Sequence, residues 1–436
     1  MNIPISALLQ RLGIEQLNPM QEKVLEVTAT NDQVVVLAPT GSGKTLGFLL
    51  PLLKNLQAEV SGVQALVITP TRELALQIEQ VFRAMGTEFK VNTTYGGHSM
   101  KIEKNNFSEP PALLIGTPGR IVDHLNRGNL DLSLVRTLVL DEFDKSLEMG
   151  FQEDMTIILK QLKRVRHRML VSATNLEVIP AFTEIANPAT VDFLTTETRG
   201  LSLHKIVTDD TEKLYSLVHL LCNLTAESTL IFCNHRETVE RVSEFMASAD
   251  IANVFFHGGL EQDERERSLI KFRNGSAYYL VTTDLAARGL DIPNIQHVIH
   301  YQLPHTEDVF IHRNGRTARQ SATGNAYLVM AKTDRQPDYL SEEIPELQLS
   351  EDCPLPDAPV WKTIYIGGGK KDKINKIDVV GFLSKIGQLK QDDIGLITVL
   401  DHSCLVAVKA KKANQVIAQI RDQKIKGKKV KMGIAR

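Results

Sequence analysis

Residues 34–45, VVVLAPTGSGKT, join a run of branched apolar residues to a loop of Gly, Ser, Lys and Thr. The apolar stretch TLGFLLPLLKNL continues from Thr45 with the pattern of a buried helix. A strand that turns through glycines into a helix lets backbone amides surround phosphate oxygens, and the start of the helix adds a partial positive charge. This stretch predicts an α/β fold with a phosphate-binding loop; a glycine-rich turn that binds nothing is the alternative.

Individual loop residues have distinct expected roles. Gly41 and Gly43 let the backbone turn inward around phosphate oxygens, and Lys44 would reach the outer phosphates. The Thr45 hydroxyl would ligate Mg²⁺. Ala38 stands where the general pattern has its first glycine.

A pair of acids follows a second apolar run, in LVLDEFD at 138–144. Asp141 at the strand end would hold the magnesium shell, and Glu142 would orient and deprotonate an attacking water. The same pair could instead cap the next helix.

Short apolar runs alternate with amphipathic stretches from about residue 30 to 330. Near-continuous Val, Ile and Leu indicate strands that are buried on both faces of parallel sheets. Two series of such strands predict two α/β domains, which we place at 1–200 and 201–335. The two series are QVVVLAP, QALVITP, ALLIGTP, TLVLDEF and MLVSAT, then STLIFCN, ANVFFHG, YYLVTTD, HVIHYQL and NAYLVMA.

The second domain contains HRNGRTAR at 312–319. Arg313, Arg316 and Arg319 are about one helical turn apart, so their guanidinium groups are expected along one helix face. An arginine that enters from another domain can stabilise charge on a transferring phosphoryl group.

Composition limits the class of protein. With 436 residues, 43% hydrophobic and 23% charged, the chain matches a soluble protein of two or three domains. We expect no membrane association, because no apolar run approaches the roughly 18 residues of a span, and the N-terminus lacks a secretory pattern. Cys222, Cys233, Cys353 and Cys404 are scattered without a C-x-x-C pair, which fits a reducing cytoplasm. We expect a cytoplasmic monomer.

The C-terminal part differs in charge from the rest. Residues 361–436 carry 17 Lys and Arg against 6 Asp and no Glu, a net charge of +11, while the other 360 residues sum to −13. A Pro- and acid-rich stretch at 336–360 is predicted to be a linker. Beyond it, strands and helices follow in the order β-α-β-β-α-β of a ferredoxin-like, RNA-recognition-type domain. The charge indicates an anionic partner, or otherwise a solvated lysine face.

The ordered motifs of residues 1–335 closely resemble the DEAD-box ATP-dependent RNA helicases. They are NPMQ (18–21), APTGSGKT (38–45), PTREL (70–74), GG (96–97), TPGR (117–120), DEFD (141–144), SAT (172–174), QDER (262–265), TTDLAARGLD (282–291) and HRNGRTAR (312–319). The resemblance implies two RecA-like parallel-sheet domains, here followed by the small α+β domain. It also implies RNA-dependent hydrolysis of ATP with Mg²⁺ and local unwinding of short RNA duplexes.

The resemblance assigns roles to single residues. Lys44, Glu142, Arg316 and Arg319 would be catalytic, the two arginines as fingers, and Gln21 would read adenine. The implied nucleotide contacts are Gln21, Ala38, Thr40, Gly41, Ser42, Gly43, Lys44, Thr45, Asp141, Gly289 and Asp291. Ser172 and Thr174 would couple the ATP and RNA sites by hydrogen bonds to the acidic motif. The RNA backbone would lie across Thr71, Arg72, Gly97, Thr117, Gly119, Arg120, Arg265 and Thr283.

Three residues depart from the family pattern. Phe143 replaces an alanine and must find space behind the site, which puts the rate of hydrolysis in question. Ile14 stands where an aromatic residue is usual, so adenine stacking and selectivity for ATP are less certain. Ala318 replaces a glycine between the two arginines, a minor change.

The tail at 360–436 is similar to the C-terminal domain of the bacterial DbpA subfamily. That similarity implies a grip on a hairpin of 23S ribosomal RNA and assistance with assembly of the 50S subunit in pre-50S particles. Tyr365 would stack on a base, although CLVAV at 404–408 lacks the aromatics of a usual RNA-binding sheet. The expected RNA-binding lysines are Lys370, Lys371, Lys373, Lys426, Lys428 and Lys429. An RNA clamp or general RNA helicase in mRNA turnover or cold adaptation, and a DNA helicase or other P-loop NTPase, are the alternatives.

Overall fold

The computed structural model describes residues 3–97, 100–175, 178–194, 201–284, 295–317, 324–340 and 343–435. The chain forms two compact units, one up to residue 198 and one that begins at residue 199. Each unit is described separately below.

The first unit is built on a seven-stranded sheet in the order β3-β4-β2-β5-β6-β1-β7, in which every neighbouring pair is parallel. Every residue of β2, β4 and β5 is buried, as the apolar runs predict. The strands are β1 (Gln33–Leu37), β2 (Ala65–Ile68), β3 (Val91–Thr94), β4 (Leu113–Gly116), β5 (Thr137–Leu140), β6 (His167–Ser172) and β7 (Ala189–Asp192).

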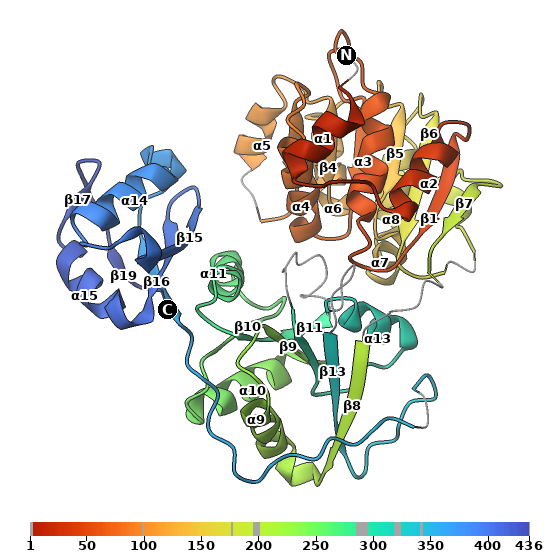
Figure 1. The fold of residues 1–436 in the computed structure, drawn as a ribbon. Coiled ribbons are helices and arrows are strands. Elements are labelled where there is room, and N and C mark those ends of the chain that lie inside the picture. The colour runs from red at the N-terminus through yellow and green to blue at the C-terminus, as the bar shows by residue number, and fades with distance from the viewer. Residues whose placement is uncertain are drawn as a thin grey trace. The chain divides into compact units, whose positions relative to one another are not determined.

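Helices cover both faces of this sheet (Figure 1). Val34 and Val36 of β1 pack into one core with α2, α3 and α4, whereas Val35 and Leu37 pack into a second core with α6 and α8. Alternate residues of one strand therefore point into opposite layers. The helices are α1 (Ile5–Leu12), α2 (Pro19–Thr28), α3 (Lys44–Lys54), α4 (Arg72–Ala84), α5 (Met100–Asn106), α6 (Pro118–Asn126), α7 (Phe143–Glu148) and α8 (Gln152–Leu159), with the 3₁₀ turn η1 (Ala181–Thr183).

The second unit contains a six-stranded parallel sheet in the order β10-β11-β9-β12-β13-β8. Its strands are β8 (Leu201–Thr208), β9 (Thr229–Cys233), β10 (Asn253–Phe256), β11 (Tyr279–Thr283), β12 (His297–His300) and β13 (Gly324–Ala331). The helical elements are η2 (Asp210–Glu212), α9 (Lys213–Asn223), α10 (Arg236–Ser248), α11 (Gln262–Arg273) and α13 (Glu307–Asn314).

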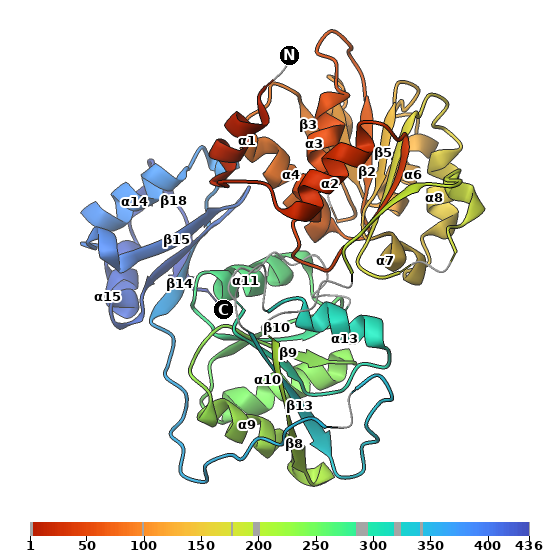
Figure 2. The same ribbon diagram turned by 45° about the vertical axis from the view of Figure 1, so that its right-hand side comes forward.

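The same unit ends in a small module with an antiparallel sheet in the order β15-β16-β14-β19. Two helices pack on one face of this sheet, where they share a core with Ile364, Val406 and Val408 (Figure 2). The elements are β14 (Trp361–Ile366), η3 (Lys370–Asp372), α14 (Lys376–Lys385), η4 (Gln391–Asp393), β15 (Ile394–Val399), β16 (Cys404–Lys409), α15 (Ala410–Ile420), β17 (Lys424–Ile425), β18 (Lys428–Lys429) and β19 (Met432–Ile434).

Two RecA-like parallel-sheet domains and a ferredoxin-like module confirm the predicted fold class. The limits 1–200, 201–335, 336–360 and 361–436 stay predictions. The segment predicted as a linker packs against the second sheet: Leu340 and Ile344 are buried beside Leu328 and Met330 of β13. Apolar residues spaced through an acidic stretch allow it to lie on a domain surface instead of extending freely.

Candidate functional site

The loop between β1 and α3 has the backbone that its glycines predict. Gly41 and Gly43 adopt φ of 84° and 85°, in the left-handed region that favours glycine. The Lys44 ammonium donates hydrogen bonds to the carbonyls of Ala38 (2.6 Å) and Pro39 (3.0 Å). The loop thus curls over the lysine at the carboxyl end of β1, the edge where parallel sheets bind ligands.

The start of α2 holds this loop from outside. Asn18 and Gln21 form a reciprocal capping box. The spare donors of the same side chains reach the loop, Asn18 Nδ2 to the Ser42 carbonyl (2.8 Å) and Gln21 Nε2 to the Gly43 carbonyl (3.1 Å). Asn18 is absent from the predicted site; its N-x-x-Q spacing is a capping signal that could have identified it.

The acidic motif lies at the end of β5. Asp141 and Glu142 are buried, at 4% and 7% exposure. Burial and then the charge of Glu142 raise the pKa of Asp141 to about 7, while Lys44 acts in the lowering direction. Glu142 adopts φ 44° and ψ 51°, a left-handed conformation unusual for a residue with a side chain. Lys44 and the two acids are therefore close enough to interact.

The SAT motif meets the acidic motif through one hydrogen bond. Thr174 Oγ1 donates to Asp144 Oδ2 at 2.9 Å. The Ser172 hydroxyl instead bonds the backbone of Thr174, to its carbonyl (2.7 Å) and from its amide (3.1 Å). Thr174 makes the expected contact, and Ser172 orients Thr174.

Phe143 finds its space in the core. Its side chain is fully buried in the cluster beneath β5 and β6, with its ring centroid 6.2 Å from that of Phe182. The large side chain therefore points away from the acids, and Asp141 and Glu142 keep their positions at the strand end.

Several predicted RNA contacts lie at the carboxyl ends of neighbouring strands. The Arg72 guanidinium lies 4.6 Å from the centroid of the Tyr95 ring, and a Cβ at Gly97 would be 3.9 Å from Arg72 Nη1. Thr71 caps α4 by accepting from the Leu74 amide. Thr117 precedes α6 without a side-chain capping bond, and Gly119 lies in its first turn.

Arg120 is part of a buried network that the sequence did not predict. Its Nε donates to Glu103 Oε2 at 2.8 Å, and His124 Nε2 lies 2.6 Å from the same oxygen. Although burial raises it, hydrogen bonds from His124, Arg120 and Thr94 leave the pKa of Glu103 below its ordinary value. Arg120 thus ties α6 to α5. Its partner is 17 residues away, so no local spacing indicated it.

Arg313 and Arg316 of the second domain do not share one helix face, contrary to prediction. Arg313 is 1% exposed, and its guanidinium pairs with Asp284 (2.5 and 2.8 Å), Gln302 and Asn234. Because α13 ends at Asn314, Arg316 lies beyond the helix, where it is also buried. Arg265 stacks on Phe256 (5.2 Å), and Thr283 ends β11. Gly289, Asp291, Ala318 and Arg319 lie outside the described residues.

The lysines of the module gather around two adjacent turns. The predicted lysines of η3 and of the β17–β18 hairpin are all exposed. Lys426 donates to the carbonyl of Lys373 (2.7 Å), and Lys428 pairs with Asp372 (2.9 Å), so the two turns are joined. Tyr365 is half-buried, with its ring against Ile270, Leu405 and Ala435, and its stacking on RNA stays a prediction.

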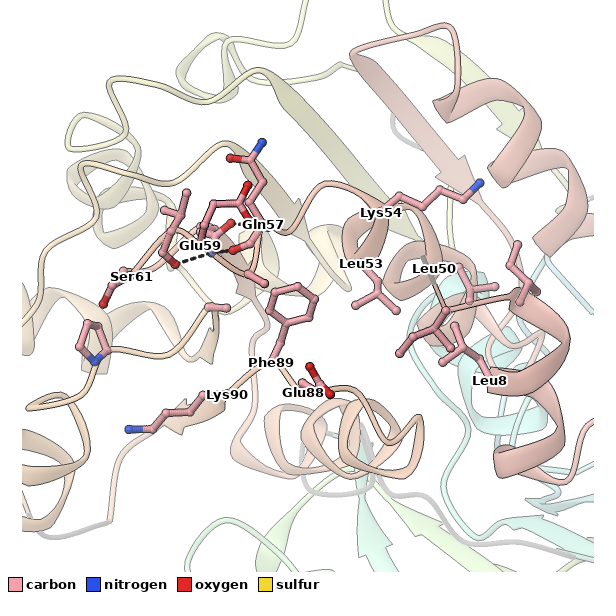
Figure 3. Close-up of a pocket in the computed structure, with 18 residues that line it drawn as sticks. Leu8, Leu50, Leu53, Lys54, Gln57, Glu59, Ser61, Glu88, Phe89 and Lys90 are labelled. Atoms are coloured by element: carbon pink, nitrogen blue, oxygen red, sulfur yellow. Dashed lines mark hydrogen bonds between the residues drawn. The ribbon is translucent and has the colours of Figure 1, made fainter. Parts of the chain in front are cut away.

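A cavity of about 440 Å³ lies in the first unit, at the sheet edge opposite the loop of Lys44 (Figure 3). Leu8, Leu50, Leu53 and Phe89 line it with Glu59 and Lys90. Residues 57–64 and 88–90 precede β2 and β3, so this cavity lies at the amino ends of strands, away from the loop of Lys44.

In the part of the chain that the structure describes, no helix is long and apolar enough to cross a membrane.

Family comparisons agree with the arrangement. The DEAD/DEAH box helicase domain matches residues 18–179, the helicase conserved C-terminal domain matches 212–321, and the DbpA RNA binding domain matches 363–434. ATP-dependent RNA helicase DbpA of Bacillus subtilis is 31% identical over 98% of this chain and 96% of its own. The chain belongs to the DEAD-box ATP-dependent RNA helicases.

A second relative supports the same assignment of this DEAD-box protein. The DbpA helicase of Escherichia coli is 33% identical over 96% of this chain and 94% of its own length. The combination of two helicase domains and a DbpA RNA-binding domain therefore extends along nearly the whole chain. As a DEAD-box helicase, the protein is an RNA-dependent ATPase.

Solved DEAD-box structures match the helicase part of the fold. Saccharomyces cerevisiae Dbp5 bound to RNA and ADP BeF3 has a TM-score of 0.68 at 26% identity, over 75% of this chain and 88% of that one. Mss116p bound to single-stranded RNA and AMP-PNP has a TM-score of 0.67 at 26% identity, over 76% and 73% of the two chains.

Proposed function

We propose that this helicase hydrolyses ATP at the loop of Lys44 and locally separates short RNA duplexes, while its C-terminal module holds a hairpin of 23S ribosomal RNA during 50S assembly. The catalytic part of the proposal rests on one observation: the charges of Lys44 and Glu142 both act on the carboxyl group of Asp141. A cation after β1 and two buried acids after β5, at the same edge of the sheet, are the groups that phosphoryl transfer to water requires.

The donor set fits a magnesium ion. Asp141 is buried beside a second carboxylate, and its pKa of about 7 reports incomplete compensation of that charge. Thr45 and Asp141 would hold the ion, which would neutralise charge on the phosphates. Hard oxygen donors of this kind suit Mg²⁺, and among the described residues no His, Cys, Asp and Glu cluster offers a richer site.

The protein groups have separate tasks in hydrolysis. Lys44 would leave its loop carbonyls for the outer phosphates, and Glu142 would orient the attacking water and accept its proton. Arg316 and Arg319 of the second domain would stabilise charge on the transferring group, and Gly289 and Asp291 would contact the nucleotide. The first domain would hold the RNA backbone with Thr71, Arg72, Gly97, Thr117, Gly119 and Arg120, and the second with Arg265 and Thr283.

The exposed lysines around η3 and the β17–β18 hairpin support hairpin binding. Clustered cations favour a phosphate backbone without reading its bases. The module would thereby concentrate the enzyme beside neighbouring duplex. We place this activity in the cytoplasm and in a monomer; the four cysteines are free thiols, as in a reducing compartment.

Substitution of the proposed catalytic residues tests the chemistry. Lys44→Ala and Glu142→Gln should each reduce RNA-stimulated ATP turnover by roughly 10²-fold or more. Glu153→Gln, on the exposed side of α8, is the matched control and should hydrolyse ATP normally. Full turnover in either catalytic variant would refute the proposal.

An RNA clamp is the second candidate function, because the same nucleotide cycle could time RNA release without unwinding. Strand separation with ATP but not with a non-hydrolysable analogue would favour the helicase. Cross-linking of bound RNA in cells would distinguish ribosomal RNA from messenger RNA. A chain ending near residue 355 should lose preference for ribosomal RNA but retain RNA-dependent hydrolysis.

A further inference from the structure

The centre of the outer face of the module sheet is buried. Cys404, Val406 and Val408 of β16 point into the module core, so Leu405 and Ala407 between them point to the opposite face. Both are nevertheless 0% exposed. On a small domain with helices on one side only, residues of the open face reach this burial when another part of the protein covers them.

The end of α11 and the turn after it supply part of that cover. Ile270 packs with Leu405, Ala435 and the ring of Tyr365. Asn274 Nδ2 donates to Thr363 Oγ1 at 2.9 Å, and Thr363 Oγ1 donates to Ser276 Oγ at 2.8 Å. Asn274 and Thr363 are buried, so movement of the module away from the domain would break these bonds and expose both side chains to water.

The turn at 274–276 also fits the module in shape. Gly275 has φ 73°, and a Cβ there would lie 3.2 Å from Cδ1 of Trp361. The Lys409 ammonium in turn lies over the Trp361 ring, 4.4 Å from the ring centroid, and a Cβ at Gly395 would lie 3.2 Å from the same ring. The indole thus covers part of the sheet face beside the turn.

The segment before the module is attached to the same domain. Ser350 accepts a hydrogen bond at its carbonyl from the His219 ring (2.6 Å), and its amide donates to Asn223 Oδ1 (2.8 Å). Glu346 forms a β-bridge with Lys205, and Leu347 and Leu349 pack against the domain core. Any flexible tether is therefore restricted to the ten residues 351–360 between Ser350 and Trp361.

We propose that the C-terminal module is docked on the second helicase domain: its sheet face is an interface for α11 and the turn at 274–276, and not an RNA-stacking surface. The lysines of η3 and of the β17–β18 hairpin stay exposed in this arrangement. The consequence for RNA rests on the proposed function. A hairpin held by these lysines would be presented at a fixed offset from the second domain, instead of being free within the reach of a flexible linker.

A distance distribution in the full chain tests docking without RNA. Donor and acceptor dyes go on Glu244→Cys in α10 and Lys385→Cys in α14, with the half-buried Cys222 and Cys353 changed to serine. A docked module should give one narrow distribution. The combined change Ile270→Asp and Thr363→Val should broaden it, because it places a charge in the apolar contact and removes the hydroxyl bonds.

Ile377→Asp is the matched control, since Ile377 is 81% exposed on α14, and it should leave the distribution narrow. Thr363→Val alone gives a milder variant that should fold. Thermal unfolding and ATP turnover verify that each variant is native. A broad distribution in the unsubstituted chain, or an unchanged one in the native double variant, would overturn docking.

An RNA series tests the consequence. A hairpin is joined to a short duplex through single-stranded spacers of increasing length, and strand separation is timed. Docking predicts an optimum spacer with about tenfold slower separation on either side, and a flattened profile for the Ile270→Asp, Thr363→Val variant. A flat profile in the unsubstituted chain would overturn the fixed offset. Hairpin affinity that is unchanged by substitution of these lysines would instead refute the proposed function, and the dye distances would still decide docking.

Discussion

The Thr174 hydroxyl donates a 2.9 Å hydrogen bond to the carboxylate of Asp144, and both residues are buried. Thr174 follows β6 and Asp144 lies in the helix after β5, so the bond joins the ends of two neighbouring strands. It connects the segment after β6 to the helix that begins directly after Asp141 and Glu142, the acids proposed to act on ATP. A rearrangement of either segment must therefore break this hydrogen bond or move the other segment with it.

Thr174→Val should reduce RNA strand separation more than ATP turnover. The change removes the hydroxyl at nearly constant volume and leaves Asp144 without that donor, a loss of roughly 1–3 kcal/mol. We expect strand separation to fall about tenfold or more, with ATP hydrolysis falling less. Thr174→Ser keeps the hydroxyl and should retain activity; an equal loss of both activities in Thr174→Val would contradict a coupling role.

The buried Asp141 should make the stability of the nucleotide-free chain depend on pH. Its pKa is raised from 3.8 to about 7, so its favourable contribution is complete below pH 3.8 and is lost as the pH rises through 7. Asp141→Asn removes the titration. Relative to the natural chain, the variant should gain about 1 kcal/mol of unfolding free energy per pH unit across this window, then level off. Denaturant unfolding at several pH values measures the difference, and a constant difference would rule out the raised pKa.

Gly43→Ala should damage the nucleotide loop beyond simple backbone strain. A Cβ at Gly43 would lie 2.5 Å from Gln21 Nε2, and its φ of 85° disfavours a side chain. Gly128 is the matched control, because its φ is 64° and a Cβ there meets nothing within 4 Å. Both variants should lose about 1 kcal/mol of stability from strain, and Gly43→Ala alone should lose nucleotide affinity. Equal nucleotide affinity in the two variants would show that the Gln21 side chain moves aside without weakening nucleotide binding.

Arg313→Lys should destabilise the second domain. Lysine cannot reproduce the two-pronged pair with Asp284 or the bonds to Gln302 and Asn234. Burial and the charge of Arg313 lower the pKa of the adjacent His300 to about 3, so this histidine stays neutral beside the arginine. We expect a loss of about 3–5 kcal/mol in denaturant unfolding. Arg421→Lys, at an exposed pair with Asp422, should change stability little; comparable losses would indicate that the buried pair is dispensable.

Loss of a module lysine should weaken RNA binding without changing its preference. Lys370→Ala removes an exposed charge in η3, and Lys429→Ala removes one in β18. Each should lower the slope of log affinity against log salt by about 1. Lys411→Ala, on exposed α15, is the control. An unchanged slope for both module variants would indicate that RNA binds to another part of the protein.

Local patterns predicted the helicase domains well because their information is contained in short stretches. Continuous apolar runs identified the buried central strands, whereas the edge strands β3, β7 and β8 were missed. Their sequences mix polar and apolar residues, as in VNTT and ATVD, and edge strands need burial on fewer sides.

Contacts between distant residues were the part that local patterns could not predict. Helical spacing predicted that Arg313 and Arg316 share one helix face. In the structure α13 ends at Asn314, before Arg316, and Arg313 pairs with the carboxylate of Asp284. Tyr365 fits a stacking motif in its own strand, yet α11 packs on that face.

The sequence by itself determined the order of strands and loops, and so the edge of each sheet at which Lys44, Asp141 and the SAT motif lie, because periodicity and chain direction are local properties. Only the tertiary structure decided that Arg120 pairs with Glu103, that Arg313 is buried, and that Thr363 meets Asn274 across 89 residues. Such pairs depend on which surfaces become buried together, and a buried polar group requires a partner wherever along the chain that partner lies.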